Sequence, residues 1–194
     1  MKTIKSTKEE ILIVNNSKFI CNIFKVYSHD EVLKYLNKIK KKYKDATHHC
    51  YAYIIDNEIR FSDDNEPSGT AGIQIKDVLT KNDLNYVLCI VTRYFGGIKL
   101  GANGLIRAYS KSTSTTLKEA NIQKIVKGTR LEISFPYDIS KEIDYILKNE
   151  KIINKKYENQ IYYTIETTNT PLINSLKSYN KVTIITKKDM NIEI

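Results

Sequence analysis

The hydrophobic positions of this chain change period several times, and each change predicts a new helix or strand. Apolar residues dominate 10–14 and 19–26, and the asparagine pair between them tolerates left-handed backbone, which favours a β-hairpin. Residues 28–31 have the form of a capping box and precede apolar positions at helical spacing. We therefore expect an amphipathic helix that ends near Lys44.

The middle of the chain predicts three strands and two helices. Residues 87–91 are apolar at every position, as in a strand that is covered on both faces. An Asp56-Asn57 link favours a tight turn between the two preceding strands. The strands are expected at 50–55, 58–62 and 87–91. One helix is expected at 70–81, and a long helix that opens with Gly101 and Gly104 is expected to reach about Ala120.

The remainder reads as a separate α+β unit. Residues 124–127, which end at Gly128, look like a boundary, so two domains are expected at 1–127 and 128–194. Strands are predicted at 130–135, 151–157, 160–167 and 181–186, with helices at 138–149 and 171–179. The order βαββαβ is the ferredoxin-like arrangement.

Charge is unevenly distributed between these two parts. The chain of 194 residues has a net charge of +9; residues 1–127 carry 21 Lys and Arg against 13 Asp and Glu, whereas 128–194 carry 10 against 9. Lys40, Lys41, Lys42 and Lys44 contribute much of this excess. They could steer a phosphate polymer towards the protein, or simply stabilise the negative end of a helix.

The cellular compartment is predicted from what the sequence lacks. No apolar stretch is long enough to span a bilayer, and the first residues do not resemble a secretory signal. The three cysteines, Cys21, Cys50 and Cys89, are widely spaced and odd in number, which favours buried free thiols over a disulfide framework. We expect a cytoplasmic protein with no membrane contact.

One stretch concentrates the residues that could bind a ligand. Six of the seven glycines fall between Gly69 and Gly104, and three of the four arginines lie in or beside this stretch. Glycine turns around a lysine at a helix start suit an anion, although neither a Walker loop nor a dinucleotide fingerprint is present. The candidate anion- or nucleic-acid-binding residues are His48, Arg60, Arg93, Tyr94, Gly96, Gly97, Lys99, Gly101, Gly104 and Arg107. Alternatively, the glycines only shape turns, and Arg93 pairs internally with a carboxylate.

An acidic loop precedes this stretch and forms a second candidate. Its polar residues are Asp63, Asp64, Glu66 and Ser68. Three carboxylates so close together could hold Mg²⁺ or act as acid and base, but their spacing is not that of a calcium loop. Capping of turns and of the following helix is the favoured interpretation, so neither a metal site nor a cofactor is expected. His48 and His49 are adjacent on a strand and should face opposite sides.

Three motifs of the chain resemble the YigZ/IMPACT protein family. They are HHCYAY, SDDNEPSGTAG and VTRYFGGIKLGANGLIRAY, and the resemblance extends over about 17–120. The remainder is similar to the C-terminal domain of bacterial YigZ proteins. Asn65 and Asn103 stand where the family pattern has glycine. The resemblance implies a first domain like the second domain of a small-subunit ribosomal protein, and a second domain like the last domain of elongation factor G.

The resemblance also implies a role in translation. We expect a non-enzymatic, RNA- or ribosome-associated module in which the arginines and glycine turns form one exposed, anion-accepting surface. One alternative is a regulator that binds a protein partner, as IMPACT does. Another is a small metal-dependent enzyme that acts on a phosphorylated or nucleotide substrate, with the acidic loop as its metal ligands. The sequence leaves the oligomeric state open.

Overall fold

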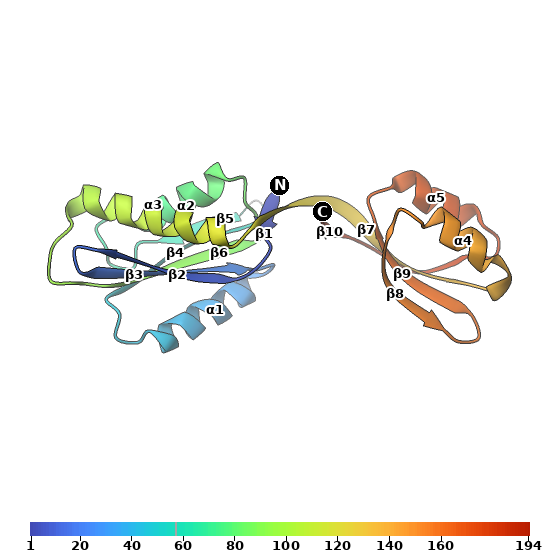
Figure 1. Cartoon of the computed structure of the whole chain (residues 1–194), viewed down its shortest axis with the longest axis horizontal. Coiled ribbons are helices and arrows are strands. Elements are labelled where there is room, and N and C mark those ends of the chain that lie inside the picture. Colours follow the sequence, from blue (N-terminus) through green and yellow to red (C-terminus); the bar gives the residue numbers. More distant parts are fainter. Residues whose placement is uncertain (57) are drawn as a thin grey trace. The chain divides into compact units, whose positions relative to one another are not determined.

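The chain divides into two compact units that both mix helices with antiparallel strands. The computed structural model describes residues 1–56 and 58–194, and the units are Met1–Lys124 and Ile125–Ile194. This confirms the two-part α+β fold expected from the sequence (Figure 1). In the described part of the chain, none of the helices has the length and apolar character that crossing a bilayer requires.

The first unit is a five-stranded antiparallel sheet with helices on both faces. The strands run in the order β2 (Lys8–Val14), β3 (Ser17–Lys25), β6 (Val87–Tyr94), β4 (His48–Ile55) and β5 (Glu58–Ser62). Helix α1 (His29–Lys42) covers one face, whereas α2 (Gly72–Lys81) and α3 (Gly101–Glu119) cover the other (Figure 1). Because β6 is central and covered on both faces, it is buried at every position but the last, and its first five residues are all apolar.

Alternation along the strands separates the two cores of this unit. Cys21, Cys89 and Val91 face α2 and α3 and pack with Tyr109 and other residues of these helices. Phe24, Leu88, Ile90 and Tyr53 face α1 and pack with its apolar stripe of Val32, Leu36 and Ile39. The parity of a position on β4, β5 or β6 therefore decides which helices its side chain meets.

Local signals in the sequence set the ends of several elements. Asn15 and Asn16 both have positive φ, as the predicted hairpin turn requires, and Ser28 Oγ accepts a hydrogen bond from the backbone N–H of Glu31. Asp56 is likewise left-handed at the start of the second predicted turn. Its expected partner, Asn57, lies outside the described residues.

The second unit has a four-stranded antiparallel sheet. Its strands run in the order β10 (Thr183–Glu193), β7 (Ile122–Phe135), β9 (Ile161–Thr167) and β8 (Lys151–Tyr157). A 3₁₀ turn (Tyr137–Ile139) and the helices α4 (Ser140–Ile146) and α5 (Thr170–Ser178) pack against it through Ile143, Leu172 and Leu176. The order βαββαβ and this strand arrangement are those of a ferredoxin-like unit.

The two units divide within the predicted boundary segment 124–127, but no linker lies there. β7 runs without interruption from Ile122 to Phe135, and its first residues pair with the short strand β1 (Lys2–Ile4). The division between the units comes after Lys124, three residues before the expected end of the first domain. Gly128 lies inside β7. The position requires glycine because a Cβ there would come within 2.8 Å of the Thr167 carbonyl oxygen. The glycine meets a demand for close packing within the second unit and does not mark a linker.

A second glycine contact fixes the end of β6. At Gly96, a Cβ would lie only 2.1 Å from the carbonyl carbon of Asn16, in the turn between β2 and β3. The chain therefore passes directly over this turn as it leaves the sheet. Gly97 differs, because its φ is +84° and no atom lies within 4 Å of the position of a Cβ.

Replacing Gly96 by alanine should destabilise the first unit by about 3 kcal/mol, because backbone atoms cannot yield to the added methyl group. Urea unfolding monitored by circular dichroism measures the change. Gly97→Ala is the matched control and should cost only about 1 kcal/mol of left-handed strain. Equal losses in the two variants would contradict the assigned close contact.

Candidate functional site

Residues from four segments meet beside the start of α3. β4 and β6 place His48 directly opposite Arg93, on the face of the sheet that α2 and α3 cover. The acidic loop, which connects β5 to α2, brings Glu66 to the same place, and Phe95 to Leu100 lead from β6 into α3. The candidate site is thus built on two central strands and completed by two loops.

A buried ion pair forms the base of this site. Arg93 Nη1 lies 2.7 Å from Glu66 Oε1, and the two side chains are only 6% and 2% exposed. The Tyr109 hydroxyl donates to the same oxygen at 2.8 Å, and Arg93 Nη2 lies 3.4 Å from Ser17 Oγ. The internal pairing considered for Arg93 is confirmed, and the expectation that Arg93 is exposed is wrong.

The other two carboxylates of the acidic loop hold backbone N–H groups. Asp63 accepts from the N–H groups of Gly69, Ala71 and Gly72 at 2.9, 3.1 and 2.7 Å. It thereby caps α2, whose own first residues supply no capping side chain. Asp64 Oδ2 accepts from the N–H of His49 at 2.6 Å. The predicted capping role is confirmed, and these contacts remove the support for Asp63 and Asp64 as metal ligands.

The two histidines face opposite sides of the sheet, as predicted. His48 Nδ1 lies 2.8 Å from the carbonyl oxygen of Asp64 and must carry a proton there, because a carbonyl can only accept. Its Nε2 then points towards Glu66 Oε1, 3.8 Å away. His49 lies on the α1 side, where its Nδ1 is 3.1 Å from Thr92 Oγ1.

Burial shifts the protonation equilibria around this site. It lowers the pKa of His49, and the charges of Lys40 and His48 act in the same direction while that of Asp64 opposes them. Burial also raises the pKa of the Cys50 thiol and of Tyr109. Cys50 therefore stays a neutral thiol, 3.0 Å from the Asp63 carbonyl oxygen, and is unsuited to be a nucleophile.

A cavity of about 380 Å³ opens above the ion pair. Its lining changes from buried polar groups to exposed residues such as Phe95 and Lys99. No side chain caps the start of α3 at Leu100, so the first N–H groups of the helix are available at the rim. The full lining is Thr47, His48, Glu66, Pro67, Arg93, Phe95, Lys99, Leu100, Gly101, Ala102 and Leu105.

The structure gathers only some of the predicted binding residues. His48, Arg93, Lys99 and Gly101 line the cavity. Gly96, Gly97 and Gly104 shape the neighbouring turn and helix start, and Tyr94, opposite Lys18 on β3, lies outside the lining. Of the acidic residues, Glu66 alone lines the cavity; Ser68 is exposed outside it. Sequence reasoning missed the apolar walls, which Pro67, Leu100, Ala102 and Leu105 provide.

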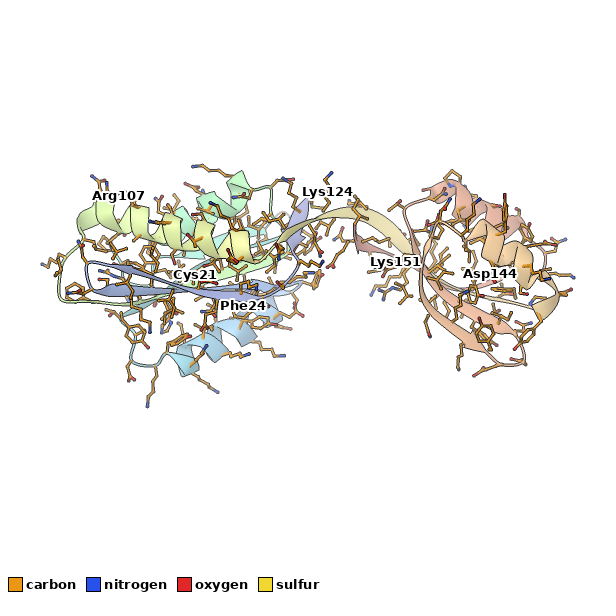
Figure 2. The ribbon with its side chains drawn as sticks, viewed as in Figure 1. Cys21, Phe24, Arg107, Lys124, Asp144 and Lys151 are labelled. Atoms are coloured by element: carbon orange, nitrogen blue, oxygen red, sulfur yellow. The ribbon has the colours of Figure 1, made fainter. Side chains whose placement is uncertain are left out.

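The arginines do not form one exposed surface, which corrects the central expectation. Arg60 lies opposite Tyr53 in the sheet, on the α1 side, and pairs with Glu58 at 3.0 Å. Arg107 projects from the outer side of α3 (Figure 2), whereas Arg93 is buried. Strand parity and helix periodicity send the three guanidinium groups in three directions.

The basic segment of α1 also lies outside the cavity lining. Lys40, Lys41 and Lys42 form the last turn of the helix, and Lys44 follows it. Lys42 pairs with Glu9 at 2.7 Å, which leaves the other three as exposed charges. Lys40 is close enough to influence the pKa of His49. Both roles considered for these lysines, helix stabilisation and steering, remain compatible with this position.

The comparison with known proteins identifies the first unit. Residues 15–117, which contain the whole lining of the cavity, match the Impact N-terminal domain. The chain belongs to the YigZ/IMPACT family. It is 46% identical over 123 residues to the IMPACT family member YvyE of Bacillus subtilis, an alignment that spans 62% of this chain but only 57% of that protein.

Other members of the YigZ/IMPACT family align over more of the chain. YigZ of Escherichia coli is 28% identical over 152 residues, which cover 75% of this chain and 74% of that protein. A solved structure of a hypothetical protein has the same fold, with a TM-score of 0.66 and 23% identity over 94% of this chain and 95% of that one. The family resemblance seen in the sequence is therefore confirmed.

The two departures from the family pattern are accommodated differently. Asn65 has a φ of 66°, so asparagine supplies the left-handed residue for which the pattern has glycine. Asn103 lies in the first turn of α3, is exposed and needs no left-handed backbone. Neither asparagine is part of the cavity lining.

Breaking the buried pair should be strongly destabilising, because a charge without its partner is left in the core. We expect Arg93→Leu and Glu66→Leu each to cost about 3–5 kcal/mol, and the double variant to cost clearly less than their sum. Denaturant unfolding of the four proteins gives the coupling. The exposed pair Arg60–Glu58 serves as the control cycle, for which little coupling is expected; additivity at Arg93 and Glu66 would contradict their assignment as a buried pair.

The pKa of His49 predicts how stability depends on pH. The folded state holds this pKa below the ordinary value of about 6.5, so the unfolded state binds more protons and stability falls as pH decreases below that value. His49→Gln should remove part of this loss between pH 7 and pH 5. Urea midpoints measured across this range test the effect, with His29→Gln at the exposed start of α1 as control. A pH profile that is unchanged in His49→Gln would refute the assignment.

Proposed function

We propose that this protein is a non-enzymatic, RNA- or ribosome-associated module that acts in the regulation of translation. The observation that carries the proposal is the cavity beside α3, which presents Lys99 and the first N–H groups of the helix at its rim. Both features favour negative charge, because the helix start carries a partial positive charge and unpaired donors. A phosphate group is the anion that an RNA chain would supply.

The charge of the first unit supports the same proposal. Lys40, Lys41 and Lys44 are exposed and lie just before Thr47, which is itself part of the cavity lining. Such a cluster raises the local concentration of a polyanion around the first unit. The exposed ring of Phe95, which is 47% accessible, adds a surface on which a base can stack.

The contacts of the acidic loop favour binding over catalysis. Asp63 and Asp64 are engaged by backbone N–H groups, and Glu66 is engaged by Arg93 and Tyr109. A metal-dependent mechanism would need these carboxylates for itself. The family resemblance links the first domain to translation control, which supports RNA or the ribosome as the partner.

The steering lysines provide the first test. The triple variant Lys40→Glu, Lys41→Glu and Lys44→Glu should bind a mixed-sequence single-stranded RNA more weakly and flatten the salt dependence of log Kd by up to about 2, since each lost phosphate contact removes about 0.7. Fluorescence anisotropy at several salt concentrations measures both. Lys177→Glu, Lys187→Glu and Lys188→Glu, three exposed positions of the second unit, make the same charge change as a control.

The outcomes separate the proposal from general charge attraction. Absence of RNA binding and of co-sedimentation with ribosomes at low salt would refute the proposal. Equal losses of RNA affinity in the two triple variants would mean that binding depends only on the net charge of the chain.

The rim of the cavity provides a second test. Lys99→Glu should weaken RNA binding about tenfold, because one charge-assisted phosphate contact is replaced by repulsion. Lys118→Glu, at the far end of α3, is the matched control and should leave affinity nearly unchanged. The same affinity in both variants would place the RNA elsewhere on the surface.

A further inference from the structure

The cavity beside α3 changes its chemistry with depth. Glu66, Arg93 and Leu105 are more than nine-tenths buried and form its inner end. Phe95 and Lys99 are exposed and form its rim. Pro67 and Ala102 add exposed apolar surface, and Leu105 adds buried apolar surface at the inner end. A ligand that fills the cavity therefore meets a charged, stacking rim and a polar inner end beside hydrocarbon.

The groups available at the inner end accept hydrogen bonds. The bonds from Arg93 and Tyr109 both go to Glu66 Oε1, and among the described residues Oε2 accepts none. His48 Nδ1 is committed to the Asp64 carbonyl, so a neutral imidazole offers the lone pair of Nε2. Arg93 directs one N–H of Nη1 to Glu66 and one N–H of Nη2 to Ser17, and its Nε is fully buried.

Acceptors at the end of an apolar cavity favour a ligand that brings donors. Glu66 Oε2 can accept a hydrogen bond from an amino group that reaches the inner end of the cavity. The rim favours an anion beside a flat apolar face, because Lys99 and the α3 N–H groups adjoin the ring of Phe95. An amino-bearing planar group attached to a phosphate meets both demands.

We propose that the cavity holds one unpaired nucleotide whose base carries an exocyclic amino group. The base stacks on Phe95 and donates its amino group to Glu66 Oε2 and His48 Nε2, while its phosphate binds Lys99 and the start of α3. This rests on the proposed RNA association and adds base selectivity to it. A volume of about 380 Å³ suits a ligand of this size, since small-molecule pockets span about 300–1,000 Å³.

Base selectivity follows from the two acceptors at the inner end, Glu66 Oε2 and His48 Nε2. Adenine and cytosine present an amino group where uracil presents a carbonyl oxygen. Uracil would set that oxygen against the Glu66 carboxylate and leave Oε2 unpaired. A site built around a hydrogen bond rejects an analogue that cannot make it, and discrimination of about tenfold corresponds to one good contact.

The test uses the full chain and three labelled RNA octamers, A8, C8 and U8, in fluorescence anisotropy at one salt concentration. We expect A8 and C8 to bind about tenfold more tightly than U8, with similar salt dependence for all three. Equal affinities would overturn the inference while leaving RNA association intact. No binding of any octamer would refute the proposed function itself.

Substitution of Glu66 tests which group reads the base. Glu66→Gln can keep one oxygen towards Arg93 and Tyr109 and place an amide N–H₂ where Oε2 was. The inner end of the cavity then offers an N–H donor in place of an acceptor. The preference for A8 and C8 over U8 should therefore disappear or reverse. An unchanged preference in a variant with a native circular dichroism spectrum would overturn the inference.

A rim substitution keeps the test valid if Glu66→Gln fails to fold. Ala102 is exposed at the mouth of the cavity, so Ala102→Trp should block entry without disturbing the core. It should abolish the base preference, whereas Ala102→Ser should retain it. A preference that survives in Ala102→Trp would show that the cavity is not the reading site.

Competition distinguishes the two sources of such a ligand. Against labelled A8, AMP and inorganic phosphate are added in parallel. Weak competition by AMP, and weaker competition by phosphate, is expected for a site that reads one nucleotide within a chain. AMP that binds as tightly as A8 would overturn RNA as the source and assign the cavity to a free nucleotide.

Discussion

The buried pair of Arg93 and Glu66 is the interaction on which the site depends. It joins the central strand β6 to the acidic loop, and Tyr109 adds α3 to the same oxygen. Removing two charges from water costs several kcal/mol, which good geometry and extra hydrogen bonds must offset. Here the guanidinium group also lies 5.5 and 5.6 Å from the ring centres of Phe19 and Phe95. One side chain thereby connects the core of the first unit to the rim of its cavity.

Much of the fold could be predicted because local patterns agree with tertiary structure. The Asn15-Asn16 turn, the Ser28 cap and the apolar run of β6 each specify an element without help from distant residues. β7 could not be delimited, because its length is set by pairing with β1 and β10 at distant positions in the chain. Gly128 was misleading for the same reason: the contact that requires glycine comes from Thr167.

The site was predictable in composition but not in direction. Arg93 has the same strand parity as the buried Cys89 and Val91, which indicates an inward side chain, yet its charge argued for exposure. The burial of Arg93 depends on Glu66, which lies on a loop 27 positions earlier in the sequence. The periodicity of the sequence does not predict that contact. Lys99 and Gly101, predicted as anion-binding residues, line the cavity, whereas its apolar walls come from residues that individually carry no chemical signal.

The three N–H groups held by Asp63 have a consequence for the rate at which a ligand is recognised. This carboxylate holds the loop that carries Glu66 in place before a ligand binds, so the cavity needs little rearrangement on binding. The entropic penalty of ordering that loop falls on folding and is absent from association. In the proposed RNA complex, the association rate should then be governed by diffusion and by the field of the exposed lysines, and the lifetime of the complex by the contacts inside the cavity.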